Sequence, residues 1–74
     1  MSALPVVSGR ETVDALRKLG YAWDRQRGSH MILRQQVPPF RRLTVPDHEE
    51  VAKGTLRAII RQAGLTVEEF RDLL

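Results

Sequence analysis

Residues 21–35 read YAWDRQRGSHMILRQ, and this stretch decides the fold because it holds two strand patterns on either side of a short turn. Residues 21–27 and residues 30–35 both have the length and the residue types typical of β-strands. The Gly-Ser pair at residues 28–29 between them is a two-residue turn signal. We therefore expect an antiparallel hairpin in which His30 is the first residue of the second strand.

Strict alternation along the first strand assigns its side chains to two faces of the sheet. One face is expected to carry Tyr21, Trp23, Arg25 and Arg27. The opposite face is expected to carry Ala22, Asp24 and Gln26. The pattern leaves open which of the two faces meets the helices.

A third strand follows the hairpin. Residues 36–39, QVPP, cannot continue a central strand because the two prolines lack N–H donors. Residues 41–45 then predict a short strand that Pro46 closes. Short connections between the three strands imply an antiparallel meander.

Helices are expected on both sides of this meander in the sequence. Ser8 and Glu11 form a capping box that opens a helix ending at Gly20. The apolar stripe of this helix consists of Val13, Leu16 and Leu19. Residues 55–63 predict a second helix that Gly64 ends, and its stripe consists of Leu56, Ile59, Ile60 and Ala63.

A second capping box, Thr66 with Glu69, opens a short final helix. This helix supplies four apolar residues, which are Val67, Phe70, Leu73 and Leu74. The order α-β-β-β-α-α predicts an α+β fold of two layers, with helices on one face of a three-stranded antiparallel sheet.

Length and composition limit the architecture and the location. Seventy-four residues predict a single domain over residues 1–74, with residues 1–7 as a loose lead-in. The sequence has no cysteine, which excludes disulfides, a thiolate nucleophile and cysteine-based zinc sites. The apolar runs are too short to span a bilayer, and the lead-in lacks the features of a signal peptide, so a cytoplasmic protein is expected.

Charge is distributed unevenly along the chain. Twelve basic and nine acidic residues give a formal net charge of +3, and ten of the twelve basic residues are arginine. Between residues 25 and 46 there is no acid but there are five arginines, namely Arg25, Arg27, Arg34, Arg41 and Arg42. A basic middle of this kind indicates a polyanion or an acidic protein as partner. Ordinary solubilising surface charge accounts for the composition equally well.

Histidine chemistry is the main candidate for function. Arginines upstream of His30 could hold phosphate while its imidazole moves a proton, as a phosphodiester-cleaving enzyme requires. From these residues alone, a plain hairpin turn with a half-exposed histidine is the favoured interpretation. His48 lies among acids, but a solvated loop is favoured over a metal site there. Tyr21 and Trp23 could stack on bases, although core positions are more usual for such residues.

Several blocks of the sequence, taken in order, resemble the HicA family, the small mRNA interferase toxins of bacterial HicA–HicB toxin–antitoxin modules. The blocks are Ser8-Gly9-Arg10-Glu11, Leu19-Gly20-Tyr21, Arg27-Gly28-Ser29-His30, Leu43-Thr44-Val45-Pro46-Asp47-His48, Lys53-Gly54-Thr55-Leu56-Arg57 and Ile60-Arg61-Gln62-Ala63-Gly64. The resemblance covers residues 8–74. It implies a double-stranded-RNA-binding-domain-like fold and ribosome-independent cleavage of RNA.

The resemblance also implies roles for individual residues. His30 corresponds to the family's catalytic histidine, and Gly28 and Ser29 would support its backbone geometry. Such a histidine can deprotonate a ribose 2′-OH, which then attacks the neighbouring phosphorus without any metal or other cofactor. The RNA contacts are inferred from the basic middle of the sequence and not from the resemblance, and they are Arg25, Arg27, Arg34, Arg41 and Arg42. Residues 36–40 form a longer, proline-rich connection than in many relatives, which is expected to change the shape beside the site.

The partners implied are mRNA and a larger, acidic HicB-like antitoxin that covers His30. Two alternatives remain open at this point. One is a non-catalytic RNA-binding module of the same fold, in which His30 only contacts the backbone. The other is a DNA-binding or protein-interaction domain whose basic face meets an acidic partner.

Overall fold

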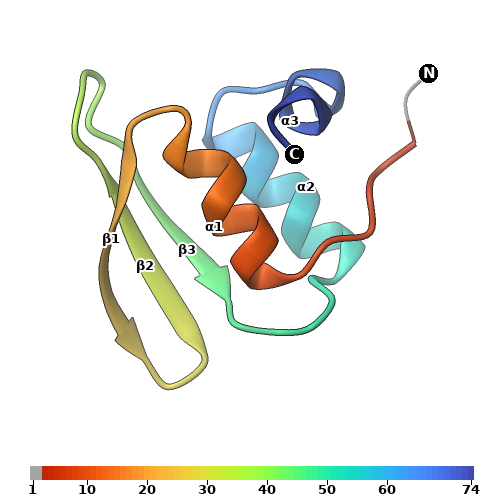
Figure 1. Cartoon of the computed structure of the whole chain (residues 1–74), viewed down its shortest axis with the longest axis horizontal. Helices are drawn as coiled ribbons and strands as arrows, with labels where there is room; N and C mark the ends of the chain where they lie inside the picture. Colours follow the sequence, from red (N-terminus) through yellow and green to blue (C-terminus); the bar gives the residue numbers. More distant parts are fainter. Residues whose placement is uncertain (1–2) are drawn as a thin grey trace.

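The computed structural model describes residues 3–74 as a sheet packed against helices (Figure 1). The elements of this part are α1 (Gly9–Arg17), β1 (Tyr21–Arg27), β2 (His30–Gln35), β3 (Arg42–Pro46), α2 (Lys53–Gln62) and α3 (Val67–Leu73). The predicted order α-β-β-β-α-α is confirmed. Boundaries differ slightly, because the third strand is displaced by one residue toward Pro46 and α2 begins at Lys53.

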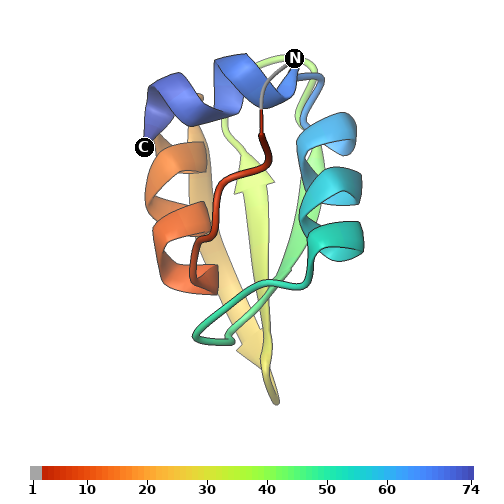
Figure 2. The same cartoon turned by 90° about the vertical axis from the view of Figure 1, so that its right-hand side faces the viewer.

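The three strands form an antiparallel sheet in the order β1-β2-β3, so β2 is the central strand. All three helices lie on one face of this sheet, and α3 lies across the ends of α1 and α2 (Figure 2). Within residues 3–74, no helix lies on the opposite face of the sheet. This is the two-layer α+β layout of a double-stranded-RNA-binding-like domain, as expected.

The core lies between the sheet and the helices. Its most deeply buried large side chains come from every layer and are Leu16, Leu33, Leu43, Leu56 and Phe70. Burying an aliphatic or aromatic side chain of this size contributes roughly 1.5–3 kcal/mol relative to leaving it exposed. In a domain this small, these few residues supply much of the free energy of folding.

Both predicted capping boxes are present. Ser8 Oγ accepts a hydrogen bond from the Glu11 backbone N–H at 3.0 Å, and the Glu11 carboxylate accepts one from Ser8 N–H at 2.9 Å. Thr66 and Glu69 form the same reciprocal pair at the start of α3. Each box satisfies backbone donors that the first turn of a helix leaves without partners.

The N-terminal lead-in approaches the core before α1 begins. Residues 1 and 2 lie outside the described residues, and residues 3–7 form neither helix nor strand. Val7 is nevertheless buried, and its carbonyl accepts a hydrogen bond of 2.9 Å from Val51 N–H. Gly9 starts α1 so close to the end of β3 that a Cβ there would lie 1.9 Å from the Pro46 carbonyl oxygen.

The alternation predicted for β1 is wrong in its second half. Trp23 pairs with Leu33 but Arg25 pairs with Ile32, so two steps along β1 match one step along β2. Asp24 is the extra residue of a β-bulge, which resets the alternation of side chains. Tyr21 and Trp23 therefore share the helix side with Gln26, whereas Arg25 and Arg27 are on the opposite side.

The proline-rich connection lies far from the hairpin turn. It joins the end of β2 to β3, whereas His30 begins β2. Five residue steps along a strand span about 16 Å. The expectation that this connection shapes the surroundings of His30 is therefore wrong.

No helix in residues 3–74 combines the length and the apolar character needed to cross a membrane.

Candidate functional site

The uncovered face of the sheet is rich in arginine, and we call it the open face. Cross-strand pairing brings Arg27, His30 and Pro46 into one row, and Arg25, Ile32 and Thr44 into the next. The third row consists of Ala22, Arg34 and Arg42. Ile32 lies on this face between Arg25 and Thr44 and is not part of the core cluster. It is nevertheless only 6% exposed.

The turn that carries the histidine depends on Gly28. Its φ is +58°, a value that residues with a Cβ adopt only under strain, and a Cβ there would touch nothing within 4 Å. Gly28 is thus required by backbone conformation rather than by a close neighbour. A glycine with positive φ at the first of two loop residues is the pattern of a type II′ hairpin turn.

His30 is exposed at the first position of β2. Its strand neighbours are Arg27 on one side and Pro46 on the other. No hydrogen bond from its imidazole is found within residues 3–74. The ring is therefore available to a bound molecule, and a guanidinium group comes from the adjacent strand.

Asp47 makes hydrogen bonds to the hairpin turn that precedes His30 and to the strand before it. Its backbone N–H donates to the Ser29 carbonyl at 2.6 Å, and its carboxylate accepts a hydrogen bond of 3.1 Å from the Gln26 amide. The same Gln26 amide donates to the Gly28 carbonyl at 3.1 Å. Asp47 therefore holds the hairpin turn through both its backbone and its side chain.

Arg10 extends this network to the start of α1. Its guanidinium binds the Asp47 carboxylate with two hydrogen bonds, from Nε to Oδ1 at 3.3 Å and from Nη2 to Oδ2 at 3.2 Å. Hydrogen bonds from Arg10 and from Gln26 lower the pKa of the Asp47 carboxyl below its ordinary value. The carboxylate is consequently ionised at neutral pH. The turn before His30 is thus held by a network of three segments, with Arg10 from α1, Gln26 from β1 and Asp47 from the residues after β3.

The arginines differ in their surroundings. Arg34 forms an ion pair of 3.2 Å with the bulged Asp24, which holds the guanidinium over the open face. Arg25, Arg27 and Arg42 are exposed on the same face and make no ion pair in the described part of the chain. Four of the five predicted RNA contacts are thus brought together.

Arg41 is directed elsewhere. Its Nη1 donates a hydrogen bond of 3.2 Å to the Ala63 carbonyl at the end of α2, on the helix side of the sheet. Tyr21 lies nearby with a buried hydroxyl that finds no hydrogen-bond partner among residues 3–74. Burial raises the pKa of the Tyr21 phenol, and the Arg41 guanidinium opposes part of this rise. Arg41 thus has a structural position.

The two aromatic residues of β1 also differ. Tyr21 is 3% exposed, as expected of a core residue, but Trp23 is 47% exposed. Alternation from Tyr21 and pairing with Leu33 place Trp23 on the helix side, yet about half of its surface is uncovered at this edge strand. The expectation of a core position is therefore right for Tyr21 and wrong for Trp23.

Sequence reasoning did not find the network around Asp47. An acid directly after a strand-ending proline is a usable signal for a turn contact, but Gln26 and Arg10 carry no comparable signal. The backbone carbonyl of His48 accepts a hydrogen bond from Gly9 N–H at 2.8 Å. Within residues 3–74 no three His, Asp or Glu side chains gather as a group that could hold a metal ion.

The fold and the site define a small α+β domain with an exposed basic sheet face and one histidine at a braced hairpin turn. The family model described as the HicA toxin of bacterial toxin–antitoxin modules matches residues 9–65 of the 74. The chain therefore belongs to the HicA toxin family. No individually curated protein matches it.

Proposed function

We propose that this toxin is a ribosome-independent endoribonuclease that cleaves mRNA at the open face with His30 as the catalytic residue. The observation that carries the proposal is the position of His30, exposed at a braced turn and adjacent to Arg27. A single imidazole supported by guanidinium groups suits the cleavage of RNA, whose 2′-OH is an internal nucleophile.

In this mechanism the neutral imidazole of His30 takes the proton from a ribose 2′-OH. The oxygen then attacks the adjacent phosphorus, and the bond from phosphorus to the 5′-oxygen breaks as that oxygen takes a proton from solvent water. The products are a 2′,3′-cyclic phosphate and a free 5′-OH. The mechanism needs no metal ion or other cofactor.

The arginines of the open face hold the substrate. Planar guanidinium groups bind phosphate oxygens with paired hydrogen bonds, and Arg27 in the same row as His30 is best placed to stabilise charge on the reacting phosphate. We assign Arg25, Arg34 and Arg42 to neighbouring phosphates of the strand. Arg41 is left out of this role because its guanidinium binds the end of α2.

A HicB-like antitoxin is the proposed protein partner. The toxin carries a net charge of +3, and the open face concentrates arginines around the reactive histidine. An acidic antitoxin that covers this face would neutralise the charge and exclude RNA at the same time.

The deciding experiment is incubation of the purified protein with a defined single-stranded RNA in excess EDTA. Wild-type protein should cleave the RNA and leave cyclic phosphate ends. His30→Ala should lower cleavage by at least about 100-fold, the usual contribution of general acid–base catalysis, and should change RNA affinity only a few-fold. His48→Ala, which removes the chain's other histidine from an exposed loop, should cleave like wild type.

The main alternative is a non-catalytic RNA-binding module. This alternative predicts that the wild-type protein binds the RNA and leaves it uncleaved. Equal cleavage by wild type and His30→Ala would instead contradict the assigned mechanism while leaving an RNA-cleaving protein.

A further inference from the structure

A groove separate from the open face lies between α1 and β1. Its volume is about 430 Å³, within the range of small-molecule sites. Val13 of α1 and Met31 of β2, both buried, form its floor. Its walls carry polar and aromatic groups, which are Arg10, Asp14, Arg17, Trp23 and Gln26.

Trp23 gives this groove an aromatic surface. The indole is 47% exposed, so much of this large apolar side chain contributes nothing to core packing. Aromatic side chains that are left accessible in this way act as stacking surfaces for nucleobases, which all present a π-face. A base lying on Trp23 would cover the apolar surface that the fold leaves open.

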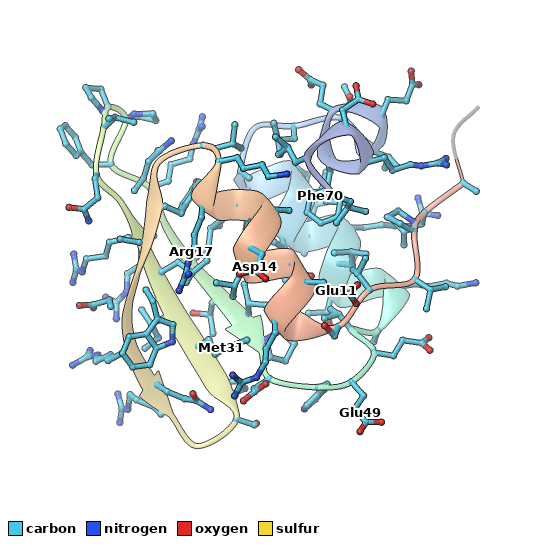
Figure 3. All side chains as sticks on the ribbon, in the orientation of Figure 1. Glu11, Asp14, Arg17, Met31, Glu49 and Phe70 are labelled. Carbon is cyan, nitrogen blue, oxygen red and sulfur yellow. The ribbon has the colours of Figure 1, made fainter. Side chains whose placement is uncertain are left out.

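The wall of the groove that α1 forms carries two positively charged side chains, Arg10 and Arg17. Arg10 and Arg17 are seven residues apart, which places them two turns and about 10 Å apart along one face of the helix. Figure 3 shows Arg17 extending from α1 toward the strands, on the side where Met31 lies. Arg17 makes no ion pair within the described residues, so its guanidinium is available to a phosphate.

Asp14 lies between these two arginines on the same wall. It forms no ion pair with either of them within residues 3–74. A carboxylate accepts hydrogen bonds only, so it suits the amino or imino N–H groups at the edge of a nucleobase. The wall therefore offers donors for a strand's phosphates and an acceptor for its base.

Gln26 connects the groove with the turn that carries His30. It lines the groove, and its amide donates to the Gly28 carbonyl at 3.1 Å. β1 is an edge strand, so a flexible strand can pass over it from the open face into the groove. A double helix is too stiff for that path, which favours single-stranded RNA.

We propose that the groove between α1 and β1 binds one nucleotide of a single-stranded RNA, with its base on Trp23 and one phosphate at Arg17. A second phosphate would bind Nη1 of Arg10, because Nε and Nη2 of that guanidinium are held by Asp47. This inference deepens the proposed nuclease function, on which it rests for the identity of the polymer. Trp23 pairs with Leu33, which lies three residues and about 10 Å along β2 from His30. The bound nucleotide would therefore lie further along the RNA than the neighbour of the nucleotide whose 2′-OH His30 activates, and the groove would set the register of cleavage.

Trp23 is the chain's single tryptophan, so its fluorescence reports on the groove directly. The test uses the full chain with His30→Ala, which prevents cleavage, titrated with a short single-stranded RNA. Stacking should quench the emission. The same ribose-phosphate strand without bases should bind through the open face but leave the emission unchanged.

Affinity measurements complete the test. In the His30→Ala background, Trp23→Ala should weaken RNA binding about tenfold, within the factor of roughly 5 to 150 that one stacked base contributes. Trp23→Phe should retain most of the affinity. Arg17→Ala should weaken binding more than Arg57→Ala, which removes the same charge from an exposed position on α2.

The outcomes separate the two proposals. Quenching by RNA in a protein whose wild type does not cleave would support the groove and overturn the nuclease assignment. Cleavage by wild type, combined with unchanged emission and equal affinity of all groove variants, would overturn the groove and leave the nuclease assignment standing. Quenching by an antitoxin but not by RNA would assign the groove to the protein partner and also overturn the inference. Circular dichroism of each variant verifies its folding.

Discussion

At the scale of single residues, Asp47 contacts the hairpin turn that carries His30. It contacts Arg10 of α1 and, in the β1–β2 hairpin, Gln26 and the Ser29 backbone, so it joins two separate segments of the chain. His30 directly follows a hairpin turn and makes few side-chain contacts of its own. We therefore expect its position to depend on the hydrogen bonds that Asp47 makes to the turn. We therefore regard Asp47 as the positioning residue of this site.

Replacement of Asp47 tests this role. Asp47→Asn removes the charge that binds Arg10, and we expect cleavage of RNA to fall about tenfold because small misplacements of a catalytic group are costly. Glu50→Gln, an exposed acid three residues later without an ion pair in the described chain, is the matched control. Equal rates for the two variants would show that the turn holds His30 without Asp47.

The same residue predicts a pH dependence of stability. The pKa of Asp47 is lower in the folded protein than its ordinary value of 3.8, so its ionised form is stabilised by folding. This contribution is fully present above that ordinary value and is lost as pH falls through the lowered folded pKa. Thermal unfolding below about pH 4 should therefore show a smaller loss of stability for Asp47→Asn than for wild type.

At the scale of elements, the bulge at Asp24 determines on which face of the sheet Arg25 and Arg27 lie. Without it, strict alternation would put Arg25 and Arg27 on the same side as Tyr21 and Trp23, against the core. With it, both arginines lie on the open face. One extra residue in an edge strand thus separates the apolar half of β1 from its basic half.

The hairpin turn makes a prediction at the same scale. Gly28→Ala forces a Cβ into a backbone conformation with φ of +58° and should destabilise the protein by about 1 kcal/mol, with lower RNA cleavage because His30 is displaced. Gly54→Ala is the control, because that glycine lies in α2 with no atom near its Cβ position. It should be stabilising by roughly 0.5 kcal/mol. Urea unfolding of both variants measures the difference, and equal stabilities would contradict the assigned role of Gly28.

At the scale of the whole molecule, the two faces of the sheet differ in what they contact. The helices cover one face and bury the core, and the other face stays open with its arginines (Figures 1 and 2). Four arginines on one side of an 8.5 kDa protein form a large share of its surface charge. Binding of RNA should therefore be dominated by phosphate contacts.

Salt dependence measures this contribution. If Arg25, Arg27, Arg34 and Arg42 each neutralise one phosphate, these four contacts alone should make the logarithm of the RNA association constant fall against the logarithm of salt concentration with a slope of about −2.8. Each phosphate contact in the groove would add about −0.7 to this slope. The His30→Ala protein is suitable for this titration. Replacing Arg25 should reduce the slope by about 0.7, whereas replacing Arg41 should leave it unchanged. A slope near zero would exclude phosphate binding by the open face.

Local sequence patterns were enough to predict the elements and their order. Capping boxes at Ser8 and Thr66, the Gly-Ser turn and the apolar helix stripes are local patterns, and each depends on contacts within a few residues. The same local reasoning placed His30 at the start of a strand, and the family resemblance gave it a proposed role. Local chemistry of this kind is readable from spacing alone.

The contacts between side chains, in contrast, follow from long-range pairing in the folded protein. The bulge at Asp24 depends on pairing with β2, the bracing of the turn joins Arg10, Gln26 and Asp47 from distant segments, and Arg41 turns to the end of α2. These features arise from contacts between residues far apart in the chain, which no periodicity records. The half-exposed position of Trp23 has the same origin, because it depends on how far α1 extends over the edge of the sheet.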